Sequence, residues 1–343
     1  MNHRRKFLHQ LSGAIVGMSF LLESCAALNV KSSKKKPLKA EHLRKGDLIG
    51  IVAPASSIKP NVVEEFKNSL EGLGFRVKVG KHVLEEYGDL AGNDKARAED
   101  INEMFSDKEV KGIFSIRGGW GSARILPLID YDNIRQNPKV LMGYSDISAL
   151  LVAVYIKTGL ITFHGPMGYD YWDSFTTNYF VQLLMENQKI VFQNPPLYRD
   201  YLHTITKGKA EGIFIGGNLS VLSALIGTNY LPRNWKEYIL FLEEVSEETY
   251  RIDRMITHLK LAGVLSSIKG FVFGQCKNCH PEDPSNSFTF QQVLEEHLKP
   301  LQIPSFSGAM FGHIAQKFTL PIGARVCLDA DNHIISLQEN VLV

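Results

Sequence analysis

Short apolar segments alternate with amphipathic helical segments between residues 48 and 158, and this alternation limits the possible folds more than any other feature. The strand-like segments are residues 48–53, 75–79, 112–116 and 140–142, and the helical periodicity falls at 62–73, 91–105, 122–129 and 147–158. Such alternation is typical of a parallel sheet with helices on both faces. We therefore predict a doubly wound α/β domain over residues 44–168.

A second set of strand and helix patterns follows a stretch without clean periodicity, residues 169–209, which we interpret as the inter-domain connection. Strands are predicted at 211–215, 238–242 and 268–273, helices at 251–262 and 290–298, and short strands near the C-terminus. These patterns indicate a smaller mixed α/β domain over residues 210–343. A chain of 343 residues that is 44% hydrophobic can build two such cores.

The N-terminus has the features of an export signal. Arg4 and Arg5 precede an apolar run that is too short for a permanent membrane anchor. The two arginines, with the Phe-Leu that follows, resemble a twin-arginine signal, and residues 22–25 resemble a bacterial lipoprotein box in which Cys25 would carry the lipid.

We therefore predict a signal peptide over residues 1–24, a tether over 25–43, and a periplasmic or outer-surface lipoprotein. The alternative is an ordinary signal that is cut near Ala26 or Ala27, so that Cys25 is discarded.

The charge balance does not favour a polyanionic partner. Lys and Arg number 38 against 36 Asp and Glu, a formal net charge of +2, and removal of residues 1–24 brings it to zero. Nucleic-acid binding is therefore not expected. Membrane contact is expected only through the possible lipid.

One short motif could indicate a cofactor. Cys276, Cys279 and His280 form the CxxCH pattern of covalent haem attachment. A single match of five residues is weak evidence, and no nearby motif marks a second haem ligand. A disulfide or free thiols in a loop is the alternative, and we expect no cofactor.

The segment GYSD, residues 143–146, leads from an apolar strand directly into a helix. A serine at this turn would project from the carboxyl edge of the sheet, and the helix N-terminus could stabilise negative charge. This is the geometry of a nucleophile elbow, although Ile147 replaces the last glycine of that motif. Alternatively, Ser145 or Asp146 only caps the helix.

A glycine-rich loop, residues 116–121, also joins a strand to a helix. A dinucleotide fingerprint would need a third glycine at position 124, where the chain has Arg124. The exposed amides of Gly118 and Gly119 could instead approach a ligand or an oxyanion. A tight turn without a ligand is the alternative.

Candidate partners for a nucleophilic serine occur in the second half. Glu243 and Glu244 end an apolar strand, where an acid is often exposed to solvent and has no catalytic role. His313 lies in a loop among glycine and apolar residues. The histidines lack HxxxH and HxH spacing, so no metal site is predicted. A serine with Glu and His partners would be a chemically complete catalytic unit.

Longer stretches resemble a known family, the serine LD-carboxypeptidases or muramoyltetrapeptide carboxypeptidases, peptidase family S66. The matching stretches cover the chain in order from residue 46. They are GDLIGIVAPAS (46–56), LAGNDKARAEDIN (90–102), IRGGWGSARILPLIDYD (116–132), NPKVLMGYSDISALL (137–151), FHGPM (163–167), GGNLSVLSALIGT (216–228), LFLEEVSEETYRIDRMITHL (240–259) and GHIAQKFTLPIGA (312–324).

The resemblance implies that Ser145 is the nucleophile, Glu243 the acid and His313 the base, at the interface of the two domains. It also implies a homodimer. The implied oxyanion hole consists of the backbone amides of Asp146, Gly118 and Gly119.

The implied activity is hydrolysis of the amide that releases the terminal D-Ala from a peptidoglycan tetrapeptide, so the expected partner is a muropeptide or another small peptide. A related branch, the microcin-immunity proteins, cleaves peptidyl-nucleotide amides. A muropeptide-binding protein without activity is a further alternative, but it should have lost one of Ser145, Glu243 and His313.

Overall fold

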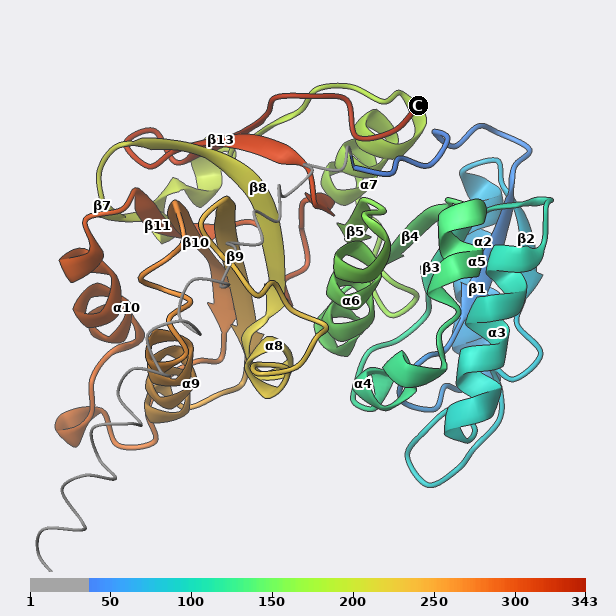
Figure 1. Ribbon diagram of the computed structural model, residues 1–343, viewed down its shortest axis with the longest axis horizontal. Coiled ribbons are helices and arrows are strands. Elements are labelled where there is room, and N and C mark those ends of the chain that lie inside the picture. Colours follow the sequence, from blue (N-terminus) through green and yellow to red (C-terminus); the bar gives the residue numbers. More distant parts are fainter. Residues whose placement is uncertain (1–36) are drawn as a thin grey trace, which may run out of the picture. The chain divides into compact units, whose positions relative to one another are not determined.

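The computed structural model describes residues 37–343, which form two β-sheets with helices packed against them (Figure 1). The predicted signal peptide and the predicted lipidation site, Cys25, lie outside these residues. No helix within residues 37–343 combines the length and the apolar character needed to cross a membrane.

The first sheet has the strand order β12-β5-β4-β3-β1-β2, and β1 to β5 are parallel. Buried apolar side chains fill the central strands, as expected when helices cover both faces. The fold therefore contains the predicted doubly wound parallel sheet. Its strands are β1 (Leu48–Val52), β2 (Arg76–Val79), β3 (Val110–Ser115), β4 (Val140–Gly143) and β5 (Thr162–His164), and its helices are α2 (Pro60–Gly72), α3 (Asp94–Ser106), α4 (Ser122–Ile125), α5 (Tyr131–Gln136) and α6 (Ser148–Thr158).

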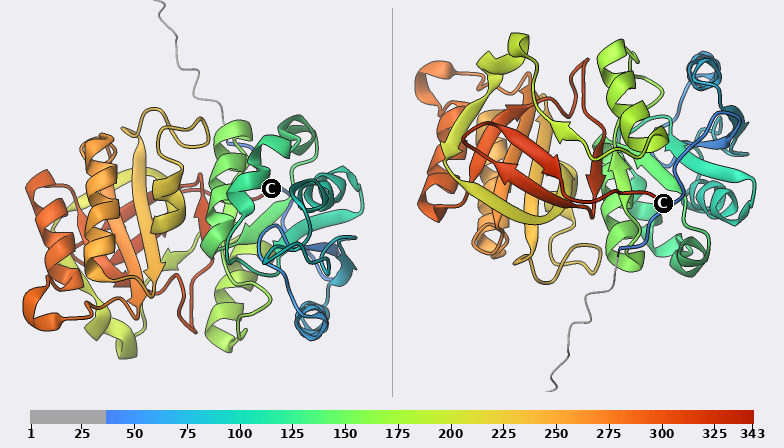
Figure 2. Two further views of the ribbon diagram at one scale, coloured as in Figure 1. Left: turned by 90° about the horizontal axis from the view of Figure 1, so that it is seen from below. Right: turned by 90° about the horizontal axis from the view of Figure 1, so that it is seen from above.

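The second sheet has the order β6-β14-β13-β8-β9-β10-β11-β7, with a parallel centre and antiparallel strands toward both edges. The two views of Figure 2 show α9 and α10 on one face of this sheet. The central strands are β8 (Lys209–Asn218), β9 (Tyr238–Val245), β10 (Gly270–Lys277) and β11 (Ser305–Ala309), the outer ones β6 (Val191–Phe192), β7 (His203–Thr206), β13 (Arg325–Asp329) and β14 (Ile334–Leu337), and the helices α8 (Leu219–Ala224), α9 (Thr249–Leu261) and α10 (Phe290–Leu298).

Helix α6 lies at the junction of the two sheets (Figure 1). Its residues 148–154 are all buried, because it contacts β4 and β5 of the first sheet and β8 and α8 of the second. A helix that is apolar around its whole circumference needs such a two-sided environment. At this junction Ser148 Oγ accepts a hydrogen bond of 3.0 Å from the backbone N–H of Asn218.

The sheets differ from the predicted domains in two ways that the sequence patterns did not indicate. Strand β12 (Leu320–Ile322), from the C-terminal half, pairs antiparallel with β5 of the first sheet. The connection at residues 169–209 contains α7 (Ser174–Phe180) and contributes β6 and β7 to the second sheet. Strands of two to four residues are too short to show a readable hydrophobic period.

Candidate active site

Ser145 lies just beyond the carboxyl end of β4, in the turn that leads to α6. Its φ angle is 62°, in the left-handed region that residues with a Cβ rarely adopt. Strain of this kind is characteristic of nucleophile elbows, where it turns the side chain away from the sheet. The helix-capping alternative does not apply, because the N-cap positions here, Tyr144 and Ile147, make no side-chain cap hydrogen bond.

Asp146 is buried and ties this turn to the neighbouring helix α4. Its carboxylate accepts a hydrogen bond of 2.7 Å from the N–H of Ser122, and the Ser122 hydroxyl donates to the Asp146 carbonyl at 2.6 Å. Burial raises the pKa of Asp146, although the hydrogen bonds oppose this shift. The side chain of Asp146 therefore has a structural partner, while its backbone amide lies beside Ser145.

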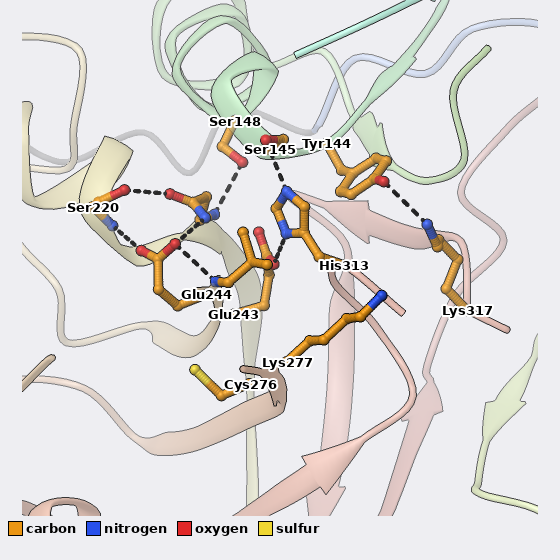
Figure 3. Close-up of polar contacts among 12 residues, drawn as sticks. Tyr144, Ser145, Ser148, Ser220, Glu243, Glu244, Cys276, Lys277, His313 and Lys317 are labelled. Atoms are coloured by element: carbon orange, nitrogen blue, oxygen red, sulfur yellow. Dashed lines mark hydrogen bonds and ion pairs between the residues drawn. The ribbon is translucent and has the colours of Figure 1, made fainter. Parts of the chain in front are cut away.

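His313 joins the serine to a buried acid (Figure 3). The distance from His313 Nε2 to Ser145 Oγ is 2.9 Å, and His313 Nδ1 lies 2.7 Å from Glu243 Oε2. Glu243 is near the carboxyl end of β9, and His313 is in the segment that leaves β11 in the second sheet and enters β12 in the first. The structure thus brings together Ser145, His313 and Glu243 from both sheets.

Gly312 allows the histidine segment to pass close to the acid. Its φ angle is +101°, and a Cβ at this position would lie 2.7 Å from Glu243 Oε2. Both the backbone conformation and the available space therefore require glycine beside His313.

Glu243 is fully buried, and it is held as a carboxylate. Burial would raise its pKa, but interactions with His164 and His313 outweigh this and lower the pKa to about 2, from an ordinary value of 4.5. The charge therefore stabilises the fold above about pH 4.5, and this stabilisation is lost as the pH falls toward 2. At neutral pH a negative charge faces the imidazole of His313.

The loop predicted to hold an oxyanion lies against the serine. A Cβ on Gly118 would be 2.8 Å from Ser145 Cβ and 3.3 Å from the backbone N of Asp146, so only glycine allows this approach. Within residues 37–343, the N–H groups of Gly118 and Gly119 have no hydrogen-bond acceptor. Gly118 and the backbone N of Asp146, two of the three predicted donor positions, thus lie close to Ser145, whereas a Cβ on Gly119 would meet Ser56. Donors beside the serine are what a tetrahedral oxyanion needs.

Glu244 faces away from His313 and is also buried. Its carboxylate accepts hydrogen bonds from Asn218 Nδ2 at 2.9 Å, from the N–H of Ser220 at 2.8 Å and from the N–H of Val245 at 3.0 Å. Strand alternation thus gives adjacent acids different environments: Glu243 contacts the imidazole, and Glu244 holds the start of α8. Neither acid is solvated, although strand ends often carry solvated acids.

Comparisons with known proteins identify the family of this chain. The family description "LD-carboxypeptidase N-terminal domain" matches residues 49–165, and "LD-carboxypeptidase C-terminal domain" matches residues 211–328. A probable murein peptide carboxypeptidase from Bacillus subtilis is 38% identical over 311 residues, which cover 88% of this chain and 95% of the relative. The chain belongs to the LD-carboxypeptidase family. It is therefore a serine-type peptidase.

Solved structures of the family have the same fold. The microcin C7 self-immunity protein MccF in its apo state is 30% identical, with a TM-score of 0.82 over 90% of this chain and all of that chain. The muramoyltetrapeptide carboxypeptidase from Oxalobacter formigenes is 28% identical, with a TM-score of 0.74 over 84% of this chain and 97% of that chain.

Sequence patterns did not indicate two features of this site. His164, at the end of β5, is buried with Nε2 3.9 Å from Glu243 Oε1, and neither atom has a hydrogen-bond partner within residues 37–343. Lys317 is buried between Asp170 and the Tyr144 hydroxyl, and the Tyr144 ring lies 5.0 Å from the His313 ring. His164 falls in the stretch FHGPM and Lys317 in the stretch GHIAQKFTLPIGA, both of which match the family. The family resemblance was therefore the only sequence signal that could have pointed to these two residues.

Cys276 and Cys279 form a disulfide at the carboxyl end of β10. The sequence left three alternatives for these cysteines: haem attachment, a disulfide or free thiols. The structure has the disulfide, which uses both thiols that covalent haem attachment would need. Cys327 is a free thiol. Residues 37–343 contain no group of three or more His, Cys, Asp or Glu side chains arranged to hold a metal ion.

Proposed function

We propose that this protein is an LD-carboxypeptidase that releases the terminal D-Ala from peptidoglycan tetrapeptides. The observation that carries the proposal is the continuous hydrogen-bonded series from Ser145 through His313 to the buried Glu243. The names of its relatives, murein peptide carboxypeptidase and muramoyltetrapeptide carboxypeptidase, support the choice of substrate.

The proposed mechanism gives each of these groups a role. His313 takes the proton from Ser145 as its oxygen bonds to the substrate carbonyl carbon, and Glu243 stabilises the imidazolium that forms. The amides of Gly118, Gly119 and Asp146 stabilise the oxyanion. The carbon–nitrogen bond then breaks, His313 donates its proton to the departing amine, and water hydrolyses the acyl-enzyme to regenerate Ser145.

A second candidate follows from the close structural similarity to MccF. One of its structures is a complex with glutamyl sulfamoyl guanosine, so related folds accept a nucleoside linked to an amino acid. A peptidyl-nucleotide amide would use the same serine, acid and histidine, and the two candidates differ only in the groups that bind the leaving part of the substrate.

The first experiment compares these substrates directly. We expect mature protein incubated with muramyl tetrapeptide to give the tripeptide and free D-Ala, detected by mass spectrometry. We expect a peptidyl-nucleotide amide to be cleaved at least tenfold more slowly, the effect of about 1.4 kcal/mol in transition-state binding. Faster cleavage of the nucleotide substrate would favour the MccF-like activity, and no cleavage of either would favour a binding protein.

We also propose that the enzyme acts outside the cytoplasm as a lipoprotein, on the basis of Arg4, Arg5 and Cys25. Labelled palmitate should be incorporated into the wild-type chain and into a Cys327→Ala control, but not into Cys25→Ala. Label that remains in Cys25→Ala, or that is absent from all three proteins, would contradict lipidation without affecting the proposed activity. The homodimer expected from the family resemblance stays a prediction for sedimentation experiments.

A further inference from the structure

A carboxypeptidase must recognise the free carboxylate of its substrate, and the chemistry fixes where that carboxylate lies. In the proposed reaction His313 Nε2 protonates the departing amine, so the amide nitrogen must be close to this atom. The carboxylate carbon of a terminal amino acid is two bonds from the same nitrogen, about 2.5 Å away. A cation that binds the carboxylate must therefore lie on the His313 side of Ser145.

Lys277 occupies this side of the site. It is the last residue of β10, whose carboxyl end lies beside that of β9, with Lys277 paired to Val245 just beyond the two acids. Figure 3 shows its side chain extending toward the side of the site where His313 and Lys317 lie. Burial is the main cause of the lowered pKa of Lys317, and the charge of Lys277 contributes to it, as expected for two neighbouring ammonium groups.

Lys277 is also available for binding. Its side chain is exposed, and it makes no ion pair within residues 37–343. The Cys276–Cys279 disulfide closes the turn immediately after β10, and the Lys277 carbonyl accepts a hydrogen bond of 2.8 Å from the N–H of Ser246. The backbone that carries this lysine is thus held on both sides.

The other two cations near the site are engaged elsewhere. Lys317 is buried and already paired with the Asp170 carboxylate. Arg117 precedes the Gly118–Gly119 loop, on the oxyanion side of Ser145, where it donates to the Ser57 carbonyl at 2.5 Å and lies over the Tyr169 ring. Neither the Arg117 guanidinium nor the buried Lys317 ammonium is therefore placed to bind a substrate carboxylate beside His313.

We propose that Lys277 binds the terminal carboxylate of the substrate, an inference that rests on the proposed carboxypeptidase function. A charge-assisted contact made equally in the ground state and the transition state affects KM rather than kcat. For Lys277→Met we therefore expect KM for the tetrapeptide to rise on the order of 10- to 100-fold, with kcat changed little. Lys277→Arg should restore most of the affinity.

The test compares tetrapeptides that end in D-Ala acid and in D-Ala amide. Wild type should prefer the acid, Lys277→Met should lose the preference, and its KM for the amide should equal that of wild type. Lys260→Met is the matched control, because Lys260 is exposed in the last turn of α9, which leads to the start of β10 rather than to its carboxyl end. It should behave as wild type.

Two outcomes would overturn the assignment of Lys277 alone: wild type cleaves acid and amide equally well, or Lys277→Met keeps the wild-type preference. In both cases D-Ala is still released from the tetrapeptide acid, so the proposed function would stand. Failure of wild type to release D-Ala from the acid and D-alanine amide from the amide would instead overturn the proposed function, and the role of Lys277 with it.

Discussion

Replacing Ser145 with alanine should lower the rate of D-Ala release by on the order of 10⁶-fold, because the atom that attacks the carbonyl is removed. His313→Ala should be about as severe, since it removes the base bonded to that atom at 2.9 Å. The double variant should lose no more activity than either single one, because residues that act as a unit have non-additive effects. Rates are measured by D-Ala release under single-turnover conditions.

The controls for this prediction are residues of the same type on exposed helix surfaces. Ser69→Ala on α2 and His258→Ala on α9 should keep wild-type rates, and circular dichroism should show that all variants fold. Substantial activity in Ser145→Ala would require a different nucleophile. Additive losses in the double variant would mean that the serine and the histidine act in separate steps.

The elbow at Ser145 could be predicted from sequence because all of its determinants are local. An apolar strand, the turn GYSD and the following helix occupy one continuous segment, so the serine must emerge at the carboxyl edge of the sheet. The structure adds the positive φ of Ser145 and the partner of Asp146. That partner, Ser122, belongs to a separate segment, which is why the pattern alone left capping open.

The meeting of Glu243 and His313 with Ser145 could not be derived from periodicity. The histidine reaches the serine only because residues 310–319 cross from β11 of one sheet to β12 of the other. Such a crossing is a property of the tertiary fold, and β12 has only three residues. The resemblance to a known family supplied this connection.

The burial of Lys317 has a similar origin. A lysine in a loop is ordinarily expected in solvent. Here Asp170 supplies the opposite charge and the Tyr144 ring lies 4.2 Å from the Lys317 ammonium, both contributed by distant parts of the chain. Burial without these partners would be costly, but sequence position does not show that they are near.

Glu243→Gln should lower the rate by on the order of 10⁴-fold, less than the loss of the serine or the histidine. Glutamine keeps the size and polarity of the side chain but lacks the charge that stabilises the imidazolium. It can also present its NH₂ group to His313 Nδ1, which would favour the wrong tautomer. The contacts with His164 and His313 that lower the pKa of Glu243 also stabilise the fold, so losing the charge should lower the melting temperature as well.

Glu244→Gln should differ in its effect on rate, because this acid accepts three hydrogen bonds and does not contact His313. The amide NH₂ would face a donor, so we expect a loss of about 1–3 kcal/mol in the free energy of unfolding and little change in rate. D-Ala release, measured on both variants, separates the two roles, and melting curves measure how much stability each variant loses. A rate loss in Glu244→Gln with near-normal Glu243→Gln would place the catalytic acid one residue later, and the 2.7 Å contact between Glu243 and His313 would then be structural.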